Sequence, residues 1–226
     1  MLLPSAMAQA ATALRTDHSG SAATRTTLGE WGQSVFAADL ATFMHCERVA
    51  VYAVEIAHEL GFDLERLATV RLGAALHDIG KTRVPAAILH KRGRLTAEEF
   101  EVVKQHPAWG LEMLETVDCP DGVREMVRFH HEKHDGTGYP DGLEGDQIPI
   151  PAAIIGIADV YDALTTQRCY RSALPRPRAL LEMHLRQQWW HPSVYAAFCR
   201  AIGRHLRGRL TFAPRRRIWA YAAAPA

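Results

Sequence analysis

The sequence predicts an all-α protein. Apolar residues recur at three- and four-residue spacing along several segments, which is the period of an amphipathic helix. No segment shows the alternation of apolar and polar residues that is typical of a half-buried strand. Histidines and aspartates interrupt the apolar segments, and imidazole and carboxylate groups are ligands that divalent metal ions accept. We therefore expect a helical bundle that surrounds a metal centre.

The composition limits the classes of function. The 226 residues suffice for one good core, and 26 Lys and Arg against 25 Asp and Glu leave a net charge of +1. This balance argues against nucleic-acid binding as the main role. No apolar run reaches about 18 residues, so no transmembrane segment is expected. The cysteines form no C-x-x-C pair and favour buried thiols in a reducing, cytoplasmic compartment: Cys46, Cys119, Cys169 and Cys199.

The N-terminal part of the chain begins with a segment that lacks helical periodicity. Residues 1–28 are rich in Ala, Ser and Thr, and we interpret them as a mobile N-terminal tail. A long helix is expected over Asp39–Leu60, with Gly61 ending it. Asp63 is expected to cap the next helix, which runs to His77 and Asp78.

The middle of the chain carries further start and stop signals for helices. The run T-A-E-E from Thr96 to Glu99 is typical of a capping box and opens a helix. Pro107 should kink that helix or start a new one. Asp121 opens the helix that is expected to end at the double histidine His130-His131. The stretch after it is too rich in Gly, Pro and Asp for a helix or strand interior.

The C-terminal part predicts three more helices. An apolar helix begins near Pro151 and runs to Leu164. Two prolines precede a helix over about Arg178–Gln187, and the last helix covers about Ser193–Leu206. Residues 206–226 form a basic C-terminal tail, interpreted as a solvated segment, with a partner or membrane-surface contact as the weaker alternative.

The residues between His130 and Pro140 organise the predicted site. Adjacent residues on a helix diverge by roughly 100°, so the two histidines can serve two neighbouring ions, or share one ion if the helix end distorts. The first alternative favours a two-metal site. Asp78 and Asp159 both lie in apolar segments, where an unpartnered carboxylate is costly to bury. A cation would be the partner that both carboxylates need.

These motifs carry a family resemblance. The chain resembles the HD-GYP family, a branch of the HD metal-dependent phosphohydrolases, over residues 35–205. The matching stretches are H-C-E-R-V-A from His45, L-H-D-I-G-K from Leu76, K-Q-H-P-A-W-G from Lys104, H-H-E-K-H-D-G-T-G-Y-P from His130 and A-D-V-Y-D-A-L-T-T-Q-R-C-Y-R from Ala158. The resemblance implies a catalytic domain over 35–205 with the fold of an HD-domain helical bundle and its HD-GYP extension.

The resemblance also implies roles for individual residues. It assigns metal-ligand roles to His45, His77, Asp78, His106, His130, His131 and Asp159. Asp78 is the expected bridging ligand between two divalent ions, and mixed histidine and carboxylate ligands suit iron or manganese, with zinc a lesser alternative. Lys81 follows Asp78 by three residues and is expected to neutralise a phosphate oxygen or protonate the leaving group.

The expected substrate contacts come from the same resemblance. Besides Lys81, they are Gly138, Tyr139, Asp162, Arg168 and Arg171. A guanidinium group can donate two hydrogen bonds to the oxygens of one phosphate, and an aromatic ring such as that of Tyr139 could stack on a purine. Two positions depart from the family pattern. Ala41 stands where many trinuclear members carry a glutamate, which favours two metal ions, and His191 replaces an aspartate near the last helix.

The resulting hypothesis is a phosphodiesterase that hydrolyses cyclic di-GMP to pGpG, and onward to GMP, in bacterial second-messenger signalling. One alternative is an HD phosphohydrolase that acts on another nucleotide. The other is a catalytically silent module that senses the dinucleotide or docks on a diguanylate cyclase or another signalling protein. The complete ligand set argues against the silent module. A homodimer is left open.

Overall fold

The computed structural model describes residues 40–115, 117–167 and 172–207. Within these ranges the chain forms helices and no strand, with one isolated bridge between Asp135 and Glu144. The all-α prediction is therefore confirmed. The predicted N-terminal tail, and all but the first two residues of the predicted C-terminal tail, lie outside the described residues. In the part of the chain that is described, no helix is both long and apolar enough to cross a bilayer.

The elements follow one another along the chain with short connections. In order they are α3 (Leu40–Glu59), α4 (Leu64–Leu76), η1 (Ile79–Arg83), α5 (Ala86–Leu89), α6 (Ala97–Val103), α7 (His106–Leu114), α8 (Asp121–Phe129), η2 (Gly145–Gln147), α9 (Ile150–Thr165), α10 (Arg176–His184), η3 (Gln187–Trp189) and α11 (Pro192–Arg207).

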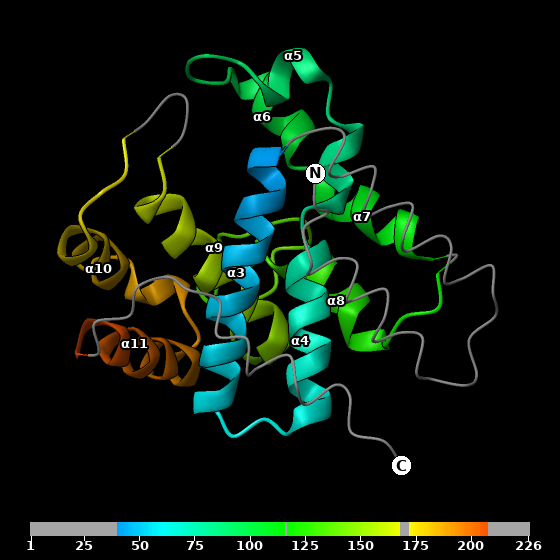
Figure 1. The fold of residues 1–226 in the computed structure, drawn as a ribbon. Helices are drawn as coiled ribbons and strands as arrows, with labels where there is room; N and C mark the ends of the chain where they lie inside the picture. Colours follow the sequence, from blue (N-terminus) through cyan, green and yellow to red (C-terminus); the bar gives the residue numbers. More distant parts are fainter. Residues whose placement is uncertain (1–39, 116, 168–171, 208–226) are drawn as a thin grey trace, which may run out of the picture.

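Helix α3 lies at the centre of the bundle. It packs against α4, α9 and α11, while α8 packs against α4, α7 and α9 (Figure 1). In Figure 1, α10 and α11 lie on one side of α3, and α7 and α8 lie on the other. The core that these helices share contains fully buried side chains such as Ile56, Ile155 and Phe198. Burial of these apolar side chains supplies the main stabilising contribution.

Local capping signals define several helix ends. Asp63 accepts a hydrogen bond from the Arg66 amide, and Gly61 adopts a φ of 78° after α3, as expected. Thr96 and Glu99 form the predicted reciprocal capping box of α6. Pro107 does not kink a continuous helix. It lies in the first turn of α7, where a missing amide hydrogen removes no helical hydrogen bond.

Two helices end earlier than their apolar patterns indicate. Helix α4 ends at Leu76, so His77 is its C-cap and Asp78 precedes the 3₁₀ helix η1. Gly80 lies so close to α7 that a Cβ atom there would overlap the His106 carbonyl, and this close packing requires the chain to leave the α4 direction. Helix α8 ends at Phe129, which leaves His130 as its C-cap.

The C-terminal helices also differ slightly from their expected bounds. Helix α10 begins at Arg176, because Pro177 is tolerated in the first turn, and it ends at His184. Helix α11 begins at Pro192 and continues to Arg207. The residue before it, His191, lies with its Nε2 atom 3.1 Å from an Asp146 carboxylate oxygen. This contact connects the start of α11 to η2.

Candidate metal centre

The structure brings the predicted ligand side chains together from five helices and the residues that flank them. They are His45 on α3, His77 and Asp78 after α4, His106 at the start of α7, His130 and His131 after α8, and Asp159 on α9. All of them except His131 are buried.

Asp78 lies at the centre of this cluster. Its Oδ1 atom is 3.3 Å from Nε2 of His106, and its Oδ2 atom is 3.4 Å from Nε2 of His77 and 3.8 Å from Nε2 of His45. The carboxylate therefore belongs to two groups of side chains, each with ligand atoms within 4.8 Å of one another: the first is His45, His77 and Asp78, and the second is Asp78, His106, His130 and His131. A shared carboxylate is the geometry that a two-ion site needs.

Backbone contacts orient three of the imidazole rings. The Nδ1 atoms of His77, His106 and His130 lie 2.7, 2.7 and 2.9 Å from the carbonyl oxygen three residues earlier in each case. A carbonyl oxygen only accepts hydrogen bonds, so each Nδ1 atom carries the proton and donates it. Each Nε2 atom is then left with a lone pair that faces the cluster.

This arrangement places unmatched acceptors opposite one another. Nε2 of His106 and Nε2 of His130 are 3.3 Å apart, although both carry lone pairs in this tautomer. Among the described residues, buried side-chain atoms without a hydrogen-bond partner include Nε2 of His45, Nε2 of His77 and Oδ1 of Asp78. Buried acceptors that face each other repel unless a cation lies between them. The side chains that are present therefore fit divalent metal ions.

The protonation states of the cluster largely suit metal binding. Partial burial lowers the pKa of His131 to about 3, and full burial with neighbouring imidazoles holds the pKa of His130 well below its usual value. Burial alone would raise the pKa of Asp78, but the ammonium group of Lys81 and the ring of His77 hold it well below its usual value. For His77, burial alone would lower the pKa, but the neighbouring Asp78 carboxylate outweighs burial and raises it, because the carboxylate favours positive charge beside it.

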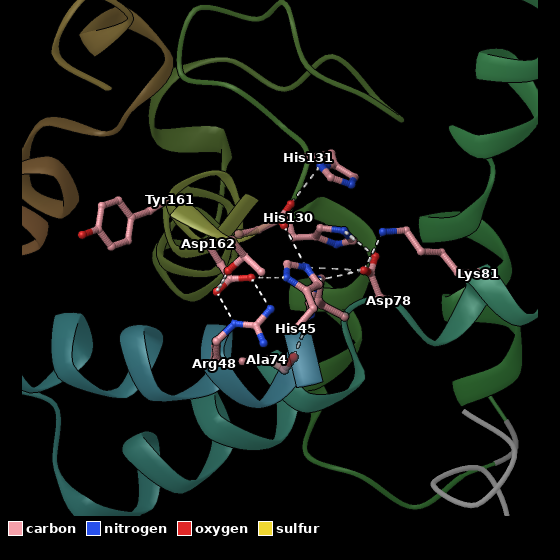
Figure 2. A network of polar contacts seen from close by, with 12 residues as sticks. His45, Arg48, Ala74, Asp78, Lys81, His130, His131, Tyr161 and Asp162 are labelled. Carbon is pink, nitrogen blue, oxygen red and sulfur yellow. Dashed lines mark hydrogen bonds and ion pairs between the residues drawn. The ribbon is translucent and has the colours of Figure 1, made fainter. Parts of the chain in front are cut away.

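Lys81 lies at the edge of the cluster. Its Nζ atom is 2.6 Å from Oδ2 of Asp78, and its side chain is 20% exposed, whereas that of Asp78 is 1% exposed (Figure 2). The one-turn spacing that the sequence indicated is kept through η1. A cation with this partial exposure can meet an incoming anion and still contact the buried carboxylate.

The glycine-rich loop packs directly on the cluster. The ring centroid of Tyr139 is 4.7 Å from that of His131 and 6.4 Å from that of Phe100, and burial raises the pKa of its hydroxyl. Gly138 lies against the backbone of Glu132, where any Cβ atom would overlap. Because Gly138 has no side chain, the loop can pack against the Glu132 backbone, and Tyr139 packs on the predicted ligand His131.

Asp162 contacts a predicted metal ligand and an arginine. The family resemblance implies that it lines the nucleotide pocket, and in the structure its side chain is 1% exposed. Its Oδ2 atom is 2.7 Å from Nδ1 of His45, and Arg48 donates to both of its oxygens at 2.6 and 3.0 Å (Figure 2). His45 and Arg48 lie one helical turn apart on α3, and Asp162 lies on α9, which packs against α3. The Asp162 carboxylate can therefore contact both side chains.

Sequence reasoning missed two residues that organise the site. Arg48 follows His45 by one turn, and this i, i+3 spacing was the available signal. Glu132 accepts hydrogen bonds from the amides of Asp141, Gly142 and Leu143, which holds the loop that carries Tyr139. An acidic residue directly after the double histidine was the only sequence sign of that role. Arg168 and Arg171 lie outside the described residues.

Comparison with known proteins places the chain in a family. Residues 15–194 match the HD domain family. The chain is 39% identical over 163 residues to the cyclic di-GMP phosphodiesterase of Thermotoga maritima, which covers 71% of this chain and 44% of that protein. It is 43% identical over 154 residues to the 3'3'-cGAMP-specific phosphodiesterase 3 of Vibrio cholerae, which covers 68% and 33% respectively. The chain thus spans less than half the length of these relatives.

A solved structure supports the same fold. The HDG"Y"P protein Bd1817 of Bdellovibrio bacteriovorus superposes with a TM-score of 0.61 at 17% identity, over 89% of this chain and 78% of that one. The helical bundle and its histidine and aspartate cluster define a metal-binding HD domain, and the chain belongs to the HD domain family. The resemblance to the HD-GYP branch, which the sequence motifs indicated, is confirmed.

Proposed function

We propose that this chain is a metal-dependent phosphodiesterase that hydrolyses cyclic di-GMP to pGpG, and onward to GMP. The observation that carries the proposal is the carboxylate of Asp78, which is shared by two groups of inward-facing histidines. The relative from Thermotoga maritima is named a cyclic di-GMP phosphodiesterase, which supports the choice of substrate. A cytoplasmic location and a diguanylate cyclase or other signalling protein as partner are part of this proposal, and a homodimer is left open.

The ligand set that we propose is His45, His77, Asp78, His106, His130, His131 and Asp159. These residues would hold two divalent ions, with iron or manganese favoured by the mixed nitrogen and oxygen donors. Bound ions would activate a water molecule and neutralise charge on the phosphodiester. Ala41, which stands in the first turn of α3 and carries no ligand atom, is consistent with two ions and not three.

The remaining roles fall to this chain's own side chains. Asp78 holds its charge in the buried centre because its pKa is lowered, so it stays an acceptor. Lys81 would hold a proton on Nζ close to the scissile phosphate, where it would stabilise developing negative charge or protonate the leaving oxygen. Arg168 and Arg171 would bind the substrate phosphates in pairs of hydrogen bonds.

A second substrate has a specific observation in its favour. The relative from Vibrio cholerae is named a 3'3'-cGAMP-specific phosphodiesterase, and its identity to this chain is of the same order. Cyclic di-GMP and 3'3'-cGAMP share the phosphodiester ring and differ in one base. Both should therefore be assayed in parallel on the same preparation.

The deciding experiment compares the wild type with Asp78→Ala. The variant should lose turnover of both dinucleotides and should contain less metal by mass spectrometry, because a ligand shared by both ions is removed. Asp118→Ala, at an exposed position, is the matched control and should keep turnover and metal. Wild-type turnover in a metal-loaded Asp78→Ala protein would refute the proposed mechanism.

A further inference from the structure

The predicted ligand histidines are not oriented in the same way. Nδ1 of His77, His106 and His130 each faces a neutral backbone carbonyl. Nδ1 of His45 instead faces a carboxylate, at 2.7 Å from Oδ2 of Asp162. Among these four rings, only that of His45 therefore has a charged partner behind it.

The Asp162 carboxylate is built into the bundle. Arg48 donates to Oδ1 through Nε at 2.6 Å and to Oδ2 through Nη2 at 3.0 Å, and the Thr166 hydroxyl lies 3.2 Å from Oδ1. Arg48 is one turn beyond His45 on α3, and Asp162 is one turn beyond Asp159 on α9. Helices α3 and α9 are thus connected at two successive turns, by His45 with Asp159 and by Arg48 with Asp162. The carboxylate has little freedom to rotate away from the imidazole.

The guanidinium group of Arg48 pairs with the buried Asp162 carboxylate and donates to both of its oxygens, so this carboxylate is an acceptor. An ionised carboxylate only accepts hydrogen bonds, so Nδ1 of His45 carries the proton. Its Nε2 atom then faces Oδ1 of Asp159 at 3.0 Å and Oδ2 of Asp78 at 3.8 Å.

A carboxylate behind a ligand imidazole changes how that imidazole binds metal. It fixes the ring orientation and the tautomer, and it increases the basicity of the far nitrogen more than a neutral carbonyl does. The group formed by His45, His77 and Asp78, with Asp159 beside it, should therefore bind a cation more tightly than the group formed by Asp78 with the other three histidines. We call these the His45 subsite and the His106 subsite.

We propose that Asp162, held by Arg48, is a positioning residue that makes the two metal subsites unequal and causes the His45 subsite to fill first. This inference rests on the proposed two-metal centre. It assigns Asp162 to the metal side of the site and not to the nucleotide pocket. It also gives Arg48 a function, because Arg48 holds the Asp162 carboxylate in line with the imidazole.

The test is a titration of the metal-free protein with Mn²⁺, followed by electron paramagnetic resonance of the free ion. The wild type should bind two ions with two separable affinities. In Asp162→Asn the tighter affinity should fall by roughly 10- to 100-fold, while the weaker one stays unchanged. Asp141→Asn is the matched control, because Arg128 likewise donates two hydrogen bonds to that exposed carboxylate, and among the described residues no histidine hydrogen-bonds to it.

A second variant separates positioning from folding. Arg48→Gln keeps the Asp162 carboxylate but removes the guanidinium that holds it. The tighter Mn²⁺ affinity should therefore fall by less in Arg48→Gln than in Asp162→Asn. Asp162→Glu, which restores a carboxylate, should recover part of the affinity that Asp162→Asn loses. Equal weakening of both affinities, or none, in folded Asp162→Asn or Arg48→Gln would overturn the inference. Two equal affinities in the wild type would overturn it while leaving the two-metal proposal intact, whereas no Mn²⁺ uptake by the wild type would refute both.

Discussion

At the scale of single residues, the site depends on contacts that stand behind the predicted ligands. The tautomer of His77, His106 and His130 follows from one backbone carbonyl each. Tyr139 packs on His131 in a similar supporting position. Such contacts determine which nitrogen faces inward, and they leave buried lone pairs that only a proton or a cation can satisfy.

Glu132 offers a test of this supporting layer. Its carboxylate accepts three backbone amides of the loop that follows Tyr139. Glu132→Ala leaves those donors without an acceptor, so the free energy of unfolding should fall by about 3 kcal/mol in urea denaturation. Glu132→Gln, which keeps one accepting oxygen, should lose less.

Glu125→Ala serves as the control for Glu132→Ala, because Glu125 is an exposed glutamate on α8, the helix that ends three residues before Glu132. It should change the free energy of unfolding by no more than about 0.5 kcal/mol. If Glu132→Ala unfolds at the same urea concentration as the wild type, the carboxylate does not hold the loop.

At the scale of elements, the cluster requires helices to approach more closely than side chains usually allow. An ideal Cβ atom at Gly156 on α9 would lie 2.5 Å from the His130 carbonyl oxygen at the end of α8. Gly80 plays the corresponding part between η1 and α7. Small residues at these two contacts bring His130 and His106 within reach of Asp78.

Gly156→Ala should separate α8 from α9. Overpacking at a buried contact should reduce stability by about 1–3 kcal/mol, and the displaced His130 should lower the metal content of the protein. Gly122→Ala is the matched control on α8, where the nearest atom would be 3.8 Å from the new Cβ atom. Thermal unfolding and metal analysis should show a lower melting temperature and a lower metal content for Gly156→Ala than for Gly122→Ala. Equal melting temperatures and metal contents in the two variants would contradict the prediction.

At the scale of the whole molecule, the predicted ligands connect parts of the chain that are far apart in sequence. The residues of the cluster run from His45 on α3 to Asp159 on α9, and both helices belong to the same core. A cation bound there would hold the central helices against α7 and α8 (Figure 1). Metal binding and folding stability should therefore be coupled.

Removal of metal should lower the melting temperature of the wild type. At a free metal concentration 100 times the dissociation constant, each site adds about 2.7 kcal/mol, which corresponds to roughly 5–10 °C for a domain of this size. Differential scanning fluorimetry with and without a chelator measures the shift. Asp78→Ala should show a much smaller difference, and an equal chelator effect in both proteins would place the stabilising ion elsewhere.

The sequence predicted much of the fold because its signals are local. Helical periodicity, the Asp63 cap and the Thr96 capping box act within one or two turns, and the structure contains all of them. The bounds of α4 and α8 were less accurate, because the positions where these helices end depend on packing against η1, α7 and α9. Local propensity contains no information about those contacts.

The sequence by itself determined the helical class and the kinds of side chain available to bind metal, because apolar periodicity and residue chemistry can be read along the chain. Only the tertiary structure decided that Asp78 is shared by two groups of histidines and that Asp162 faces His45 and Arg48. The contact of Asp162 with His45 joins residues 117 positions apart in the sequence. Such contacts exist because close-packed helices at Gly80 and Gly156 bring distant segments together.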